Sequence, residues 1–305
     1  MDCKTDNYSD LAAERGCREL ACPRGIDEVG PEAGALRPAG VAEADVAGAK
    51  VVSVNPGNVT KGLPVIHAVV LVMDPVTGRP LALMDGTWLT ALRTGAIGGL
   101  AAQVLSRKDS SVVALFGAGV QARTQLEAVR CVRDIQEVRV VSLSGTSAQQ
   151  LASELEGVTA LGLSDPSIAI AGADIVIAAT SSTTPVFKGC QIDPGTHVTG
   201  VGSFTIDMRE VDAELITRAR VVVDQRDAIL DEAGDIVGPI RDGVVDESIM
   251  HAEIGEILLG EKEGRRDSEQ ITFFKSVGNA VQDLAVASLV LEVAEREDLG
   301  VVVDI

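Results

Sequence analysis

The sequence has 305 residues, enough for two domains or one large one, and 46% of them are hydrophobic. Aromatic residues make up only 2%, so the core must be built from alanine, valine, leucine and isoleucine. The net charge of −19 disfavours binding to nucleic acid and to anionic membranes, and no run of about 18 apolar residues predicts a membrane span. The five cysteines form no CxxC pair, so we expect free thiols and no metal site. The polar N-terminus has no apolar stretch typical of a signal peptide, so we expect none, and a cytoplasmic protein.

The first third of the chain predicts an antiparallel sheet followed by a long helix. Residues 1–45 show little periodicity, and we expect an irregular start or a loosely packed edge there. Thr87 is the predicted cap of a helix that runs to about Ser106, and its many small residues allow another backbone to approach closely. The predicted strands before it are Lys50–Asn55, Val65–Met73 and Pro80–Met84.

From Ser110 onward, apolar strands alternate with helices. The predicted strands are Val112–Phe116, Val138–Ser142, Ile175–Thr180, His197–Val201 and Val221–Asp224. The predicted helices are Val120–Val132, a short one at Ile168–Gly172 and a final one at about Gly278–Arg296. Near-continuous apolar strands separated by helices predict an α/β fold with a parallel sheet covered on both faces.

A glycine-rich motif, Gly-Ala-Gly-Val-Gln-Ala, follows the first of these strands and opens a helix. Gly117 permits the tight turn, Gly119 leaves room for backbone N–H groups to approach a pyrophosphate, and Ala122 lets the helix pack closely on the sheet. The helix N-terminus then favours phosphate. The motif therefore predicts a dinucleotide cradle that includes Val120 and Gln121, and an ordinary tight turn is the plain alternative.

The end of the second parallel strand bears on the choice between NAD and NADP. An aspartate or glutamate there would bind the adenosine ribose of NAD, and the segment carries none. The hydroxyls of Ser142 and Ser144 could accept a 2′-phosphate, but the arginine that often binds that phosphate is also absent. We expect NAD or NADP, with a slight preference for NADP.

Several segments in order make the chain resemble the ornithine cyclodeaminase/μ-crystallin family from roughly Ala49 to the C-terminus. They read GAKVVS (48–53), GLPVIHA (62–68), LMDGT (83–87), TALRT (90–94), the glycine motif, VGS (201–203), DMRE (207–210) and FKSVG (274–278). The family includes ornithine cyclodeaminases, alanine dehydrogenases, ketimine and cyclic-imine reductases, and cofactor-binding crystallins, which are usually dimers. The resemblance implies a substrate and dimerisation domain (1–108), a Rossmann domain (109–277), a C-terminal helix that returns to the first domain (278–305), and a homodimer.

The resemblance also implies roles for individual residues. Lys50 matches a lysine that hydrogen-bonds the substrate near its reacting carbon, and Arg93 matches an arginine that binds a carboxylate. The alternatives are a solvent-facing lysine and a packing salt bridge. Arg24 is the best match to a second carboxylate-binding arginine, in a segment that departs from the family pattern. Thr94 matches a residue that contacts the cofactor phosphate.

Other matched positions lie at or near predicted strand ends. Thr180, Val201 and Gly202 are expected along the adenine and nicotinamide path. Ser276 and Val277 are expected to close over the nicotinamide, with Val277 next to the substrate. Ligands of parallel sheets bind beyond the carboxyl ends of the strands, which agrees with these positions.

Two further side chains bear on the substrate. Ornithine cyclodeaminases carry an aspartate where this chain has Phe204, which cannot accept a proton or bind an amine, so cyclodeamination is disfavoured and an apolar or cyclic substrate is favoured. His67 could contact the substrate as a proton shuttle or be a hydrogen-bonded structural histidine. His197 and His251 are interpreted as structural.

These observations predict NAD(P)-dependent reduction of a small-molecule 2-imino acid. A cyclic imine such as Δ1-pyrroline-2-carboxylate, which gives proline, fits a pocket with Phe204. Arg93 and Arg24 would hold the carboxylate, and Lys50 would supply a hydrogen bond or proton to the imine. Ornithine cyclodeamination, alanine dehydrogenation and a crystallin-like binding function remain open alternatives.

Overall fold

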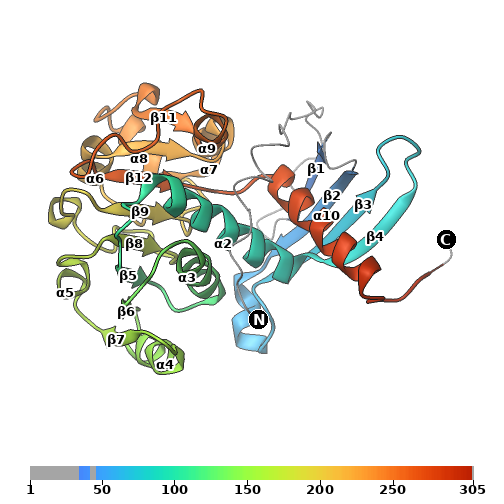
Figure 1. The fold of residues 1–305 in the computed structure, drawn as a ribbon, viewed down its shortest axis with the longest axis horizontal. Helices are drawn as coiled ribbons and strands as arrows, with labels where there is room; N and C mark the ends of the chain where they lie inside the picture. The colour runs from blue at the N-terminus through green and yellow to red at the C-terminus, as the bar shows by residue number, and fades with distance from the viewer. Residues whose placement is uncertain (1–33, 42–45, 304–305) are drawn as a thin grey trace. The chain divides into compact units, whose positions relative to one another are not determined.

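The computed structural model describes residues 34–41 and 46–303, which divide into two compact units (Figure 1). The parallel-sheet unit contains Thr94–Gly278. The antiparallel-sheet unit contains the described residues up to Arg93 and those from Asn279 on. Helix α2 (Gly86–Leu105) begins in the second of these units and continues into the first.

The parallel-sheet unit is built on eight strands in the order β11-β10-β12-β9-β8-β5-β6-β7, and every pairing is parallel. In chain order the strands are β5 (Val112–Phe116), β6 (Glu137–Val141), β7 (Thr159–Leu163), β8 (Ile175–Ala178), β9 (His197–Gly200), β10 (Arg220–Val223), β11 (Met250–Glu253) and β12 (Thr272–Lys275). The chain runs outward from β5 to β7 and then returns to β8 on the other side of β5. This reversal is the switch point of a doubly wound Rossmann sheet, so the predicted fold class is confirmed.

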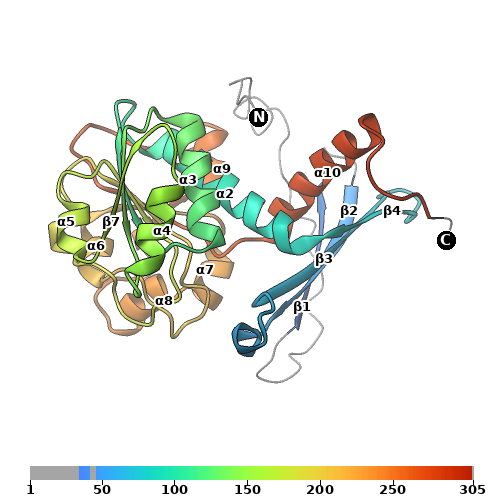
Figure 2. The ribbon, with the colours of Figure 1, turned by 90° about the horizontal axis from the view of Figure 1, so that it is seen from below.

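Helices cover both faces of this sheet, as Figures 1 and 2 show. They are α3 (Val120–Val132), α4 (Thr146–Glu154), α5 (Pro166–Ile170), α6 (Ala213–Arg218), α7 (Arg226–Glu232), α8 (Gly234–Arg241) and α9 (Ile254–Leu258), with short 3-10 turns at η3 (Gly189–Gln191) and η4 (Glu247–Ile249). Alternate residues of β5 enter different cores: Val113 and Leu115 pack with α3 and α4, whereas Ala114 and Phe116 pack with α5 and α6. Burial on both faces explains why these strands read as continuous apolar runs.

Small residues of α2 allow it to approach α3, as the composition of the helix predicts. A Cβ added at Gly95 would lie 2.6 Å from the carbonyl oxygen of Thr124, and one at Gly99 would lie 2.7 Å from the Cβ of Ala128. Both distances are too short for real side chains, so glycine is required where the two helices touch.

The antiparallel-sheet unit has four strands in the order β1-β2-β3-β4 and one long helix. Its elements are β1 (Gly34–Val41), β2 (Val46–Val54), η2 (Pro56–Lys61), β3 (Ile66–Met73), β4 (Pro80–Asp85), the start of α2, and α10 (Ala280–Arg296). Helix α10 lies along one face of this sheet in both views (Figures 1 and 2). Leu284 and Ala287 of α10 pack there on Val46, Val70 and Val72.

The expectation that residues 1–45 are irregular is wrong for residues 34–41. These residues form β1, which pairs with β2 along its whole length from Gly34↔Ser53 to Val41↔Val46. The strand contains Pro38 and two glycines, which normally argue against a strand. It is an edge strand with one neighbour, where a missing backbone donor is tolerated, and this explains the error.

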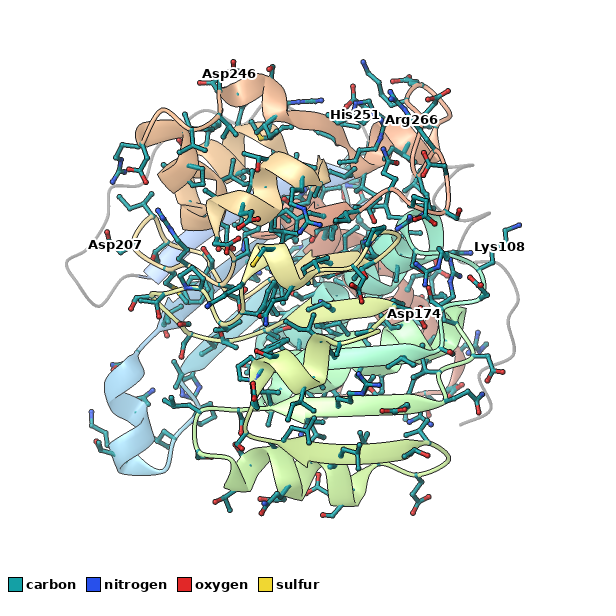
Figure 3. The ribbon with its side chains drawn as sticks, turned by 90° about the vertical axis from the view of Figure 1, so that its left-hand side faces the viewer. Lys108, Asp174, Asp207, Asp246, His251 and Arg266 are labelled. Atoms are coloured by element: carbon teal, nitrogen blue, oxygen red, sulfur yellow. The ribbon has the colours of Figure 1, made fainter. Side chains whose placement is uncertain are left out.

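The two edges of the parallel sheet are distinguished by the labelled residues of Figure 3. Asp174 precedes β8 and marks the amino ends of the strands, whereas Asp207 follows β9 and lies at the opposite edge. The glycine motif follows β5 and therefore belongs to the carboxyl edge. Among the described residues, no helix is sufficiently long and apolar to span a membrane.

Candidate active site

The glycine motif forms the turn between β5 and α3 that its sequence predicts. Gly117 has φ = +105°, a backbone conformation that residues with a Cβ rarely adopt, and an added Cβ would lie 2.3 Å from the carbonyl oxygen of Ala179. Its N–H donates to the carbonyl of Val141 at 2.8 Å. The turn is thereby fixed between the carboxyl ends of β6 and β8, beside the switch point.

The N-terminus of α3 has the properties of a phosphate cradle. Gly119 is the N-cap and provides no side-chain acceptor for the first turn, and that turn contains no acidic residue. A Cβ built on Gly119 would meet no atom within 4 Å, so the space beside it is open. Val120 is exposed and Gln121 is half-buried at the start of the helix. A pyrophosphate fits this site, because it needs open space and backbone N–H donors.

Serine hydroxyls follow β6, at the position that reads the adenosine ribose in Rossmann folds. Ser147 at the start of α4 hydrogen-bonds Ser142 at 2.8 Å and Ser144 at 2.9 Å through their Oγ atoms. Ser144 is exposed and Ser142 half-buried. The first turn of α4 has no acidic residue, so no carboxylate in that turn would repel a 2′-phosphate.

Two of the positions expected along the adenine and nicotinamide path lie in loops that one buried carboxylate ties together. Thr180 follows β8, and its N–H and hydroxyl donate to Glu210. Gly202 follows β9 and donates its N–H to the other oxygen of the same carboxylate. Val201, between β9 and Gly202, is buried. The DMRE segment (207–210) matches the family pattern, but no local feature of the sequence indicates that Glu210 binds these two loops.

A second carboxylate fixes the segment that follows β12. Asp224, directly after β10, accepts hydrogen bonds from the Ser276 hydroxyl at 2.7 Å, the Val277 N–H at 3.1 Å and the Gly278 N–H at 2.7 Å. Ser276 is buried and Val277 half-buried. Asp224 is not among the predicted site residues, although an aspartate directly after an apolar parallel strand is a signal of a site.

In the antiparallel-sheet unit, Lys50 and Arg93 meet on one aspartate. The Lys50 Nζ lies 2.6 Å from Oδ2 of Asp283, and the Arg93 Nε lies 3.0 Å from Oδ1. Arg93 also donates from Nη1 to the side chain of Gln282 at 3.0 Å, and Lys50 lies 3.5 Å from the Thr90 hydroxyl. All three charged side chains are at least nine-tenths buried. Lys50 therefore does not face solvent, and an ammonium and a guanidinium are held side by side.

The local sequence explains how α10 brings Asp283 to Lys50. Gly48 lies two residues before Lys50 on the same face of β2, and an added Cβ would lie 2.1 Å from Leu71 O and 2.8 Å from Leu284 Cδ2. The absence of a side chain lets α10 approach the sheet. Asn279 caps the helix by accepting from the Gln282 N–H at 3.0 Å. The sequence signal for Asp283, an acid in an apolar helix stripe, was missed.

Other predicted site residues are not part of this cluster. His67 pairs with Ser53 on the face of the sheet opposite to Lys50, which pairs with Val70 under α10. This placement argues against the expected substrate contact of His67. In the parallel-sheet unit, Phe204 is 41% exposed in the loop after β9. Arg24 lies outside the described residues.

Thr94 lies where α2 enters the parallel-sheet unit. Its side chain is buried, and its carbonyl oxygen accepts a hydrogen bond from the amide of Gln125 in α3. Gln125 is itself fully buried. Thr94 is therefore fixed against the helix that begins at the phosphate cradle.

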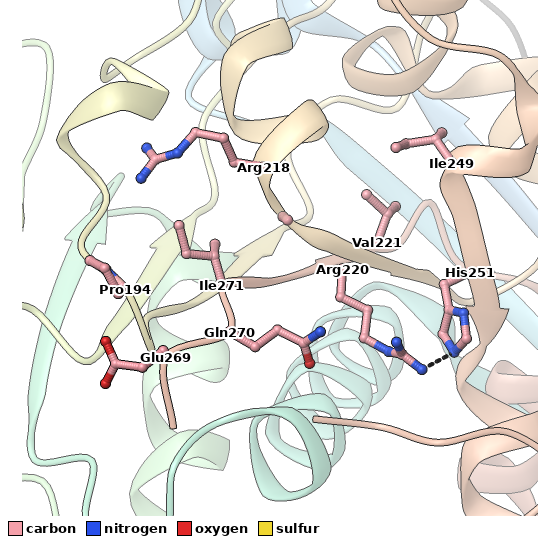
Figure 4. A pocket seen from close by; sticks show the side chains of 10 residues that line it. Pro194, Arg218, Arg220, Val221, Ile249, His251, Glu269, Gln270 and Ile271 are labelled. Carbon is pink, nitrogen blue, oxygen red and sulfur yellow. Dashed lines mark hydrogen bonds between the residues drawn. The ribbon is translucent and has the colours of Figure 1, made fainter. Parts of the chain in front are cut away.

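Two histidines of the parallel-sheet unit lie outside the candidate site. His197 is fully buried between the hydroxyls of Thr272 and Thr199, at 2.9 and 3.0 Å, and burial lowers its pKa to about 3. His251 contacts Arg220 in a cavity of about 500 Å³ at the amino ends of β10 and β12 (Figure 4). Desolvation and the nearby Arg220 lower the pKa of His251. That cavity is on the opposite edge of the sheet from the glycine motif.

Comparison with known proteins decides the family. The sequence model of the Ornithine cyclodeaminase/mu-crystallin family matches residues 28–298. The chain belongs to this family. A Delta(1)-pyrroline-2-carboxylate reductase of Bacillus cereus is 40% identical over 257 residues, which cover 83% of this chain and 79% of the relative.

Solved structures of the family have the same fold. Thermococcus litoralis Delta(1)-pyrroline-2-carboxylate reductase in complex with NADH and L-proline matches with a TM-score of 0.90 and 40% identity, over 97% of this chain and 94% of that one. An archaeal alanine dehydrogenase dimer with bound NAD matches with a TM-score of 0.89 and 36% identity, over 97% and 91% of the two chains. Family members with this fold therefore bind a nicotinamide cofactor, and the geometry of the glycine motif in this chain fits one.

Proposed function

We propose that this protein reduces the C=N bond of a cyclic 2-imino acid, with Δ1-pyrroline-2-carboxylate as the substrate and proline as the product. The observation that carries the proposal is the meeting of Lys50 and Arg93 on Asp283. A guanidinium next to an ammonium suits a substrate that has a carboxylate next to an imine. The similarity to reductases of this substrate supports the same choice.

Each charged side chain has a distinct role in this proposal. Arg93 binds the substrate carboxylate, and Lys50 donates a hydrogen bond or proton to the imine nitrogen. Asp283 holds both cations in place through its two oxygens. NADH or NADPH, when bound, supplies the hydride that the imine carbon receives. The cradle at Gly117 and Gly119 binds the pyrophosphate, and Thr180, Gly202 and Ser276 define the nicotinamide side.

Phe204 favours imine reduction over cyclodeamination. A phenyl ring can neither accept a proton nor bind the distal amine of ornithine, so a substrate with a second amino group gains no contact from it. A five-membered cyclic imine lacks that amine and therefore needs no polar side chain at this position. We propose that Phe204 contributes an apolar wall for the ring.

We propose that the enzyme uses NADH or NADPH, with a slight preference for NADPH. The serine hydroxyls at Ser142 and Ser144 can donate to a 2′-phosphate, and the first turn of α4 has no acid to repel it. The two solved relatives contain NADH or NAD. In this enzyme, a kcat/KM for NADH much higher than that for NADPH would contradict the expected preference for NADP.

We also propose that the protein is a homodimer, like the archaeal alanine dehydrogenase. The sheet face opposite to α10 exposes apolar side chains at Val51, Val69 and Leu83, the last of them 73% exposed. They line a hollow of about 540 Å³ with His67. A second copy of the chain would cover this face. Light scattering should give twice the chain mass, and Leu83→Lys should give the single mass, whereas Leu259→Lys in the other unit should not.

The experiment that tests the function measures cofactor oxidation by absorbance. We expect rapid loss of reduced cofactor with Δ1-pyrroline-2-carboxylate, and much slower loss with pyruvate and ammonia. L-Ornithine with NAD would be run in parallel and scored for proline and ammonia. Formation of proline and ammonia from ornithine without net cofactor change would contradict the proposal and the argument from Phe204, and faster oxidation with pyruvate and ammonia would favour an alanine dehydrogenase.

A further inference from the structure

Glu210 lies in the turn before α6, and its side chain is completely buried. Its Oε1 accepts the Thr180 N–H at 2.6 Å and the Thr180 hydroxyl at 2.9 Å. Its Oε2 accepts the Gly202 N–H at 2.6 Å and the Ser203 N–H at 3.2 Å. One carboxylate thus takes four hydrogen bonds from the loops that follow β8 and β9, which are neighbours in the sheet.

Asp235, which forms a buried ion pair with Lys275, holds the backbone of Glu210 in place. Oδ1 of Asp235, at the start of α8, accepts the Glu210 N–H at 2.7 Å and the Val211 N–H at 3.1 Å. Its Oδ2 lies 3.0 Å from Nζ of Lys275, the last residue of β12, and both side chains are completely buried. The group Glu210, Asp235 and Lys275, here named the buried brace, therefore ties together the carboxyl ends of β8, β9 and β12.

Burial of these charged groups costs free energy of folding. Burial raises the pKa of the Glu210 carboxyl, whereas Lys275 and the hydrogen bonds from Thr180 lower it. Replacing buried ions by apolar residues is often neutral or stabilising, so stability alone does not explain the brace. The loops are also packed tightly against it. A Cβ on Gly202 would lie 2.0 Å from the Thr180 carbonyl and 2.4 Å from Oε1 of Glu210.

We propose that Glu210 is a positioning residue, which presets the Thr180 and Gly202 loops as the surface that receives the nicotinamide half of the cofactor. The inference rests on the proposed binding of NAD(P)H, and it assigns Glu210 no contact with the cofactor. The glycine motif, which we propose binds the pyrophosphate, is fixed by its own hydrogen bond from the Gly117 N–H to Val141, and the Glu210 carboxylate accepts its hydrogen bonds from the Thr180 and Gly202 loops instead. Loss of Glu210 should therefore affect the nicotinamide half and spare the ADP-ribose half.

The test is Glu210→Gln, which keeps the shape and replaces one acceptor oxygen by an NH₂ donor. In either orientation the amide of Gln points a donor at the donors of one loop. We expect the dissociation constant for NADH to rise about tenfold, as for the loss of one charge-assisted hydrogen bond, while that for ADP-ribose stays unchanged. Glu214→Gln, an exposed glutamate of α6, is the matched control and should leave both constants unchanged.

The readout is the ratio of the two dissociation constants, measured by titration calorimetry without turnover. An equal loss of NADH and ADP-ribose affinity, or no loss of either, would overturn the positioning role. Because binding is measured directly, the test stands even if the wild-type enzyme binds NADH and fails to reduce the imine. That result would refute the proposed reaction alone.

A measurement on the wild-type protein keeps the inference testable if Glu210→Gln does not fold. Amide hydrogen exchange should show the N–H groups of Thr180, Gly202 and Ser203 already protected without cofactor, with little further protection when NADH is added. Fast exchange in the free protein, followed by protection only with NADH, would show that the cofactor and not the brace orders these loops.

Discussion

The candidate phosphate cradle of the parallel-sheet unit consists of main-chain geometry, whereas the candidate substrate site of the antiparallel-sheet unit consists of long charged side chains. Gly117 and Gly119 act by lacking a side chain: Gly117 adopts the positive φ of the turn, and Gly119 leaves open space at the N-terminus of α3. Lys50, Arg93 and Asp283 act through atoms far from their backbones. Substitutions in the two units should therefore have different effects: those in the substrate site should change turnover, and those in the cradle should change cofactor affinity or folding.

Lys50→Met should give the largest effect on turnover. Removing the ammonium takes away the hydrogen bond or proton to the imine, and such groups contribute about 10²–10⁴-fold to rate. Steady-state kinetics with Δ1-pyrroline-2-carboxylate should show a loss of kcat in this range, while NADH still binds. Lys61→Met, at an exposed lysine in η2 of the same unit, should retain activity. A Lys50→Met enzyme with normal kcat would show that Lys50 does not act on the imine.

Asp283→Asn should lower kcat/KM for the imine by about tenfold to a hundredfold. An asparagine offers one acceptor oxygen and no charge, so it cannot hold both Lys50 and Arg93. NADH affinity should not change. Glu292→Gln, at an exposed glutamate of the same helix, is the matched control and should behave as wild type. Equal activity of the two variants would show that Asp283 does not position the cations.

Gly119→Ala and Gly117→Ala should separate the two effects of the cradle. The Cβ at Gly119 enters open space, so the variant should fold normally and bind NADH about tenfold more weakly, a change of about 1.4 kcal/mol. The Cβ at Gly117 meets Ala179 O and a positive φ, so this variant should lose about 1–3 kcal/mol of its free energy of unfolding. Thermal melting measures the loss of stability, and NADH titration measures the loss of affinity. A destabilised Gly119→Ala would show that the space beside Gly119 is not open.

His197 lies outside both the phosphate cradle and the substrate site, and it should make the free energy of unfolding depend on pH. Its folded pKa of about 3 lies below the ordinary value of 6.5, so between these values the unfolded chain binds the proton and the folded one does not. Stability is therefore lost as the pH falls, by up to about 1.4 kcal/mol per pH unit. The free energy of unfolding, measured by urea titration at several pH values between 6.5 and 4, should depend less steeply on pH for His197→Gln than for wild type. The same pH dependence in both proteins would show that His197 does not contribute.

Features that depend on neighbouring residues could be predicted from the sequence, whereas contacts between distant side chains could not. The turn at Gly117 and the helix from Val120 depend on neighbouring residues, and both were predicted where the structure places them. Asp283 is 190 residues from Arg93, and Asp235 is 40 residues from Lys275, so only the folded chain brings these pairs together. The strand β1 was missed because its proline and glycines are tolerated only at the edge position that the topology gives it.

The atom that receives the hydride distinguishes imine reduction from the other reactions. Δ1-Pyrroline-2-carboxylate would be reduced by the enzyme with NADH carrying deuterium at the transferring position of nicotinamide C4, and the proline would be analysed by mass spectrometry. We expect one deuterium at Cα of proline, and formation of this product about 10²–10⁴-fold more slowly by Lys50→Met. Proline without deuterium, or no proline at all from an enzyme that binds both ligands, would contradict the proposed imine reduction.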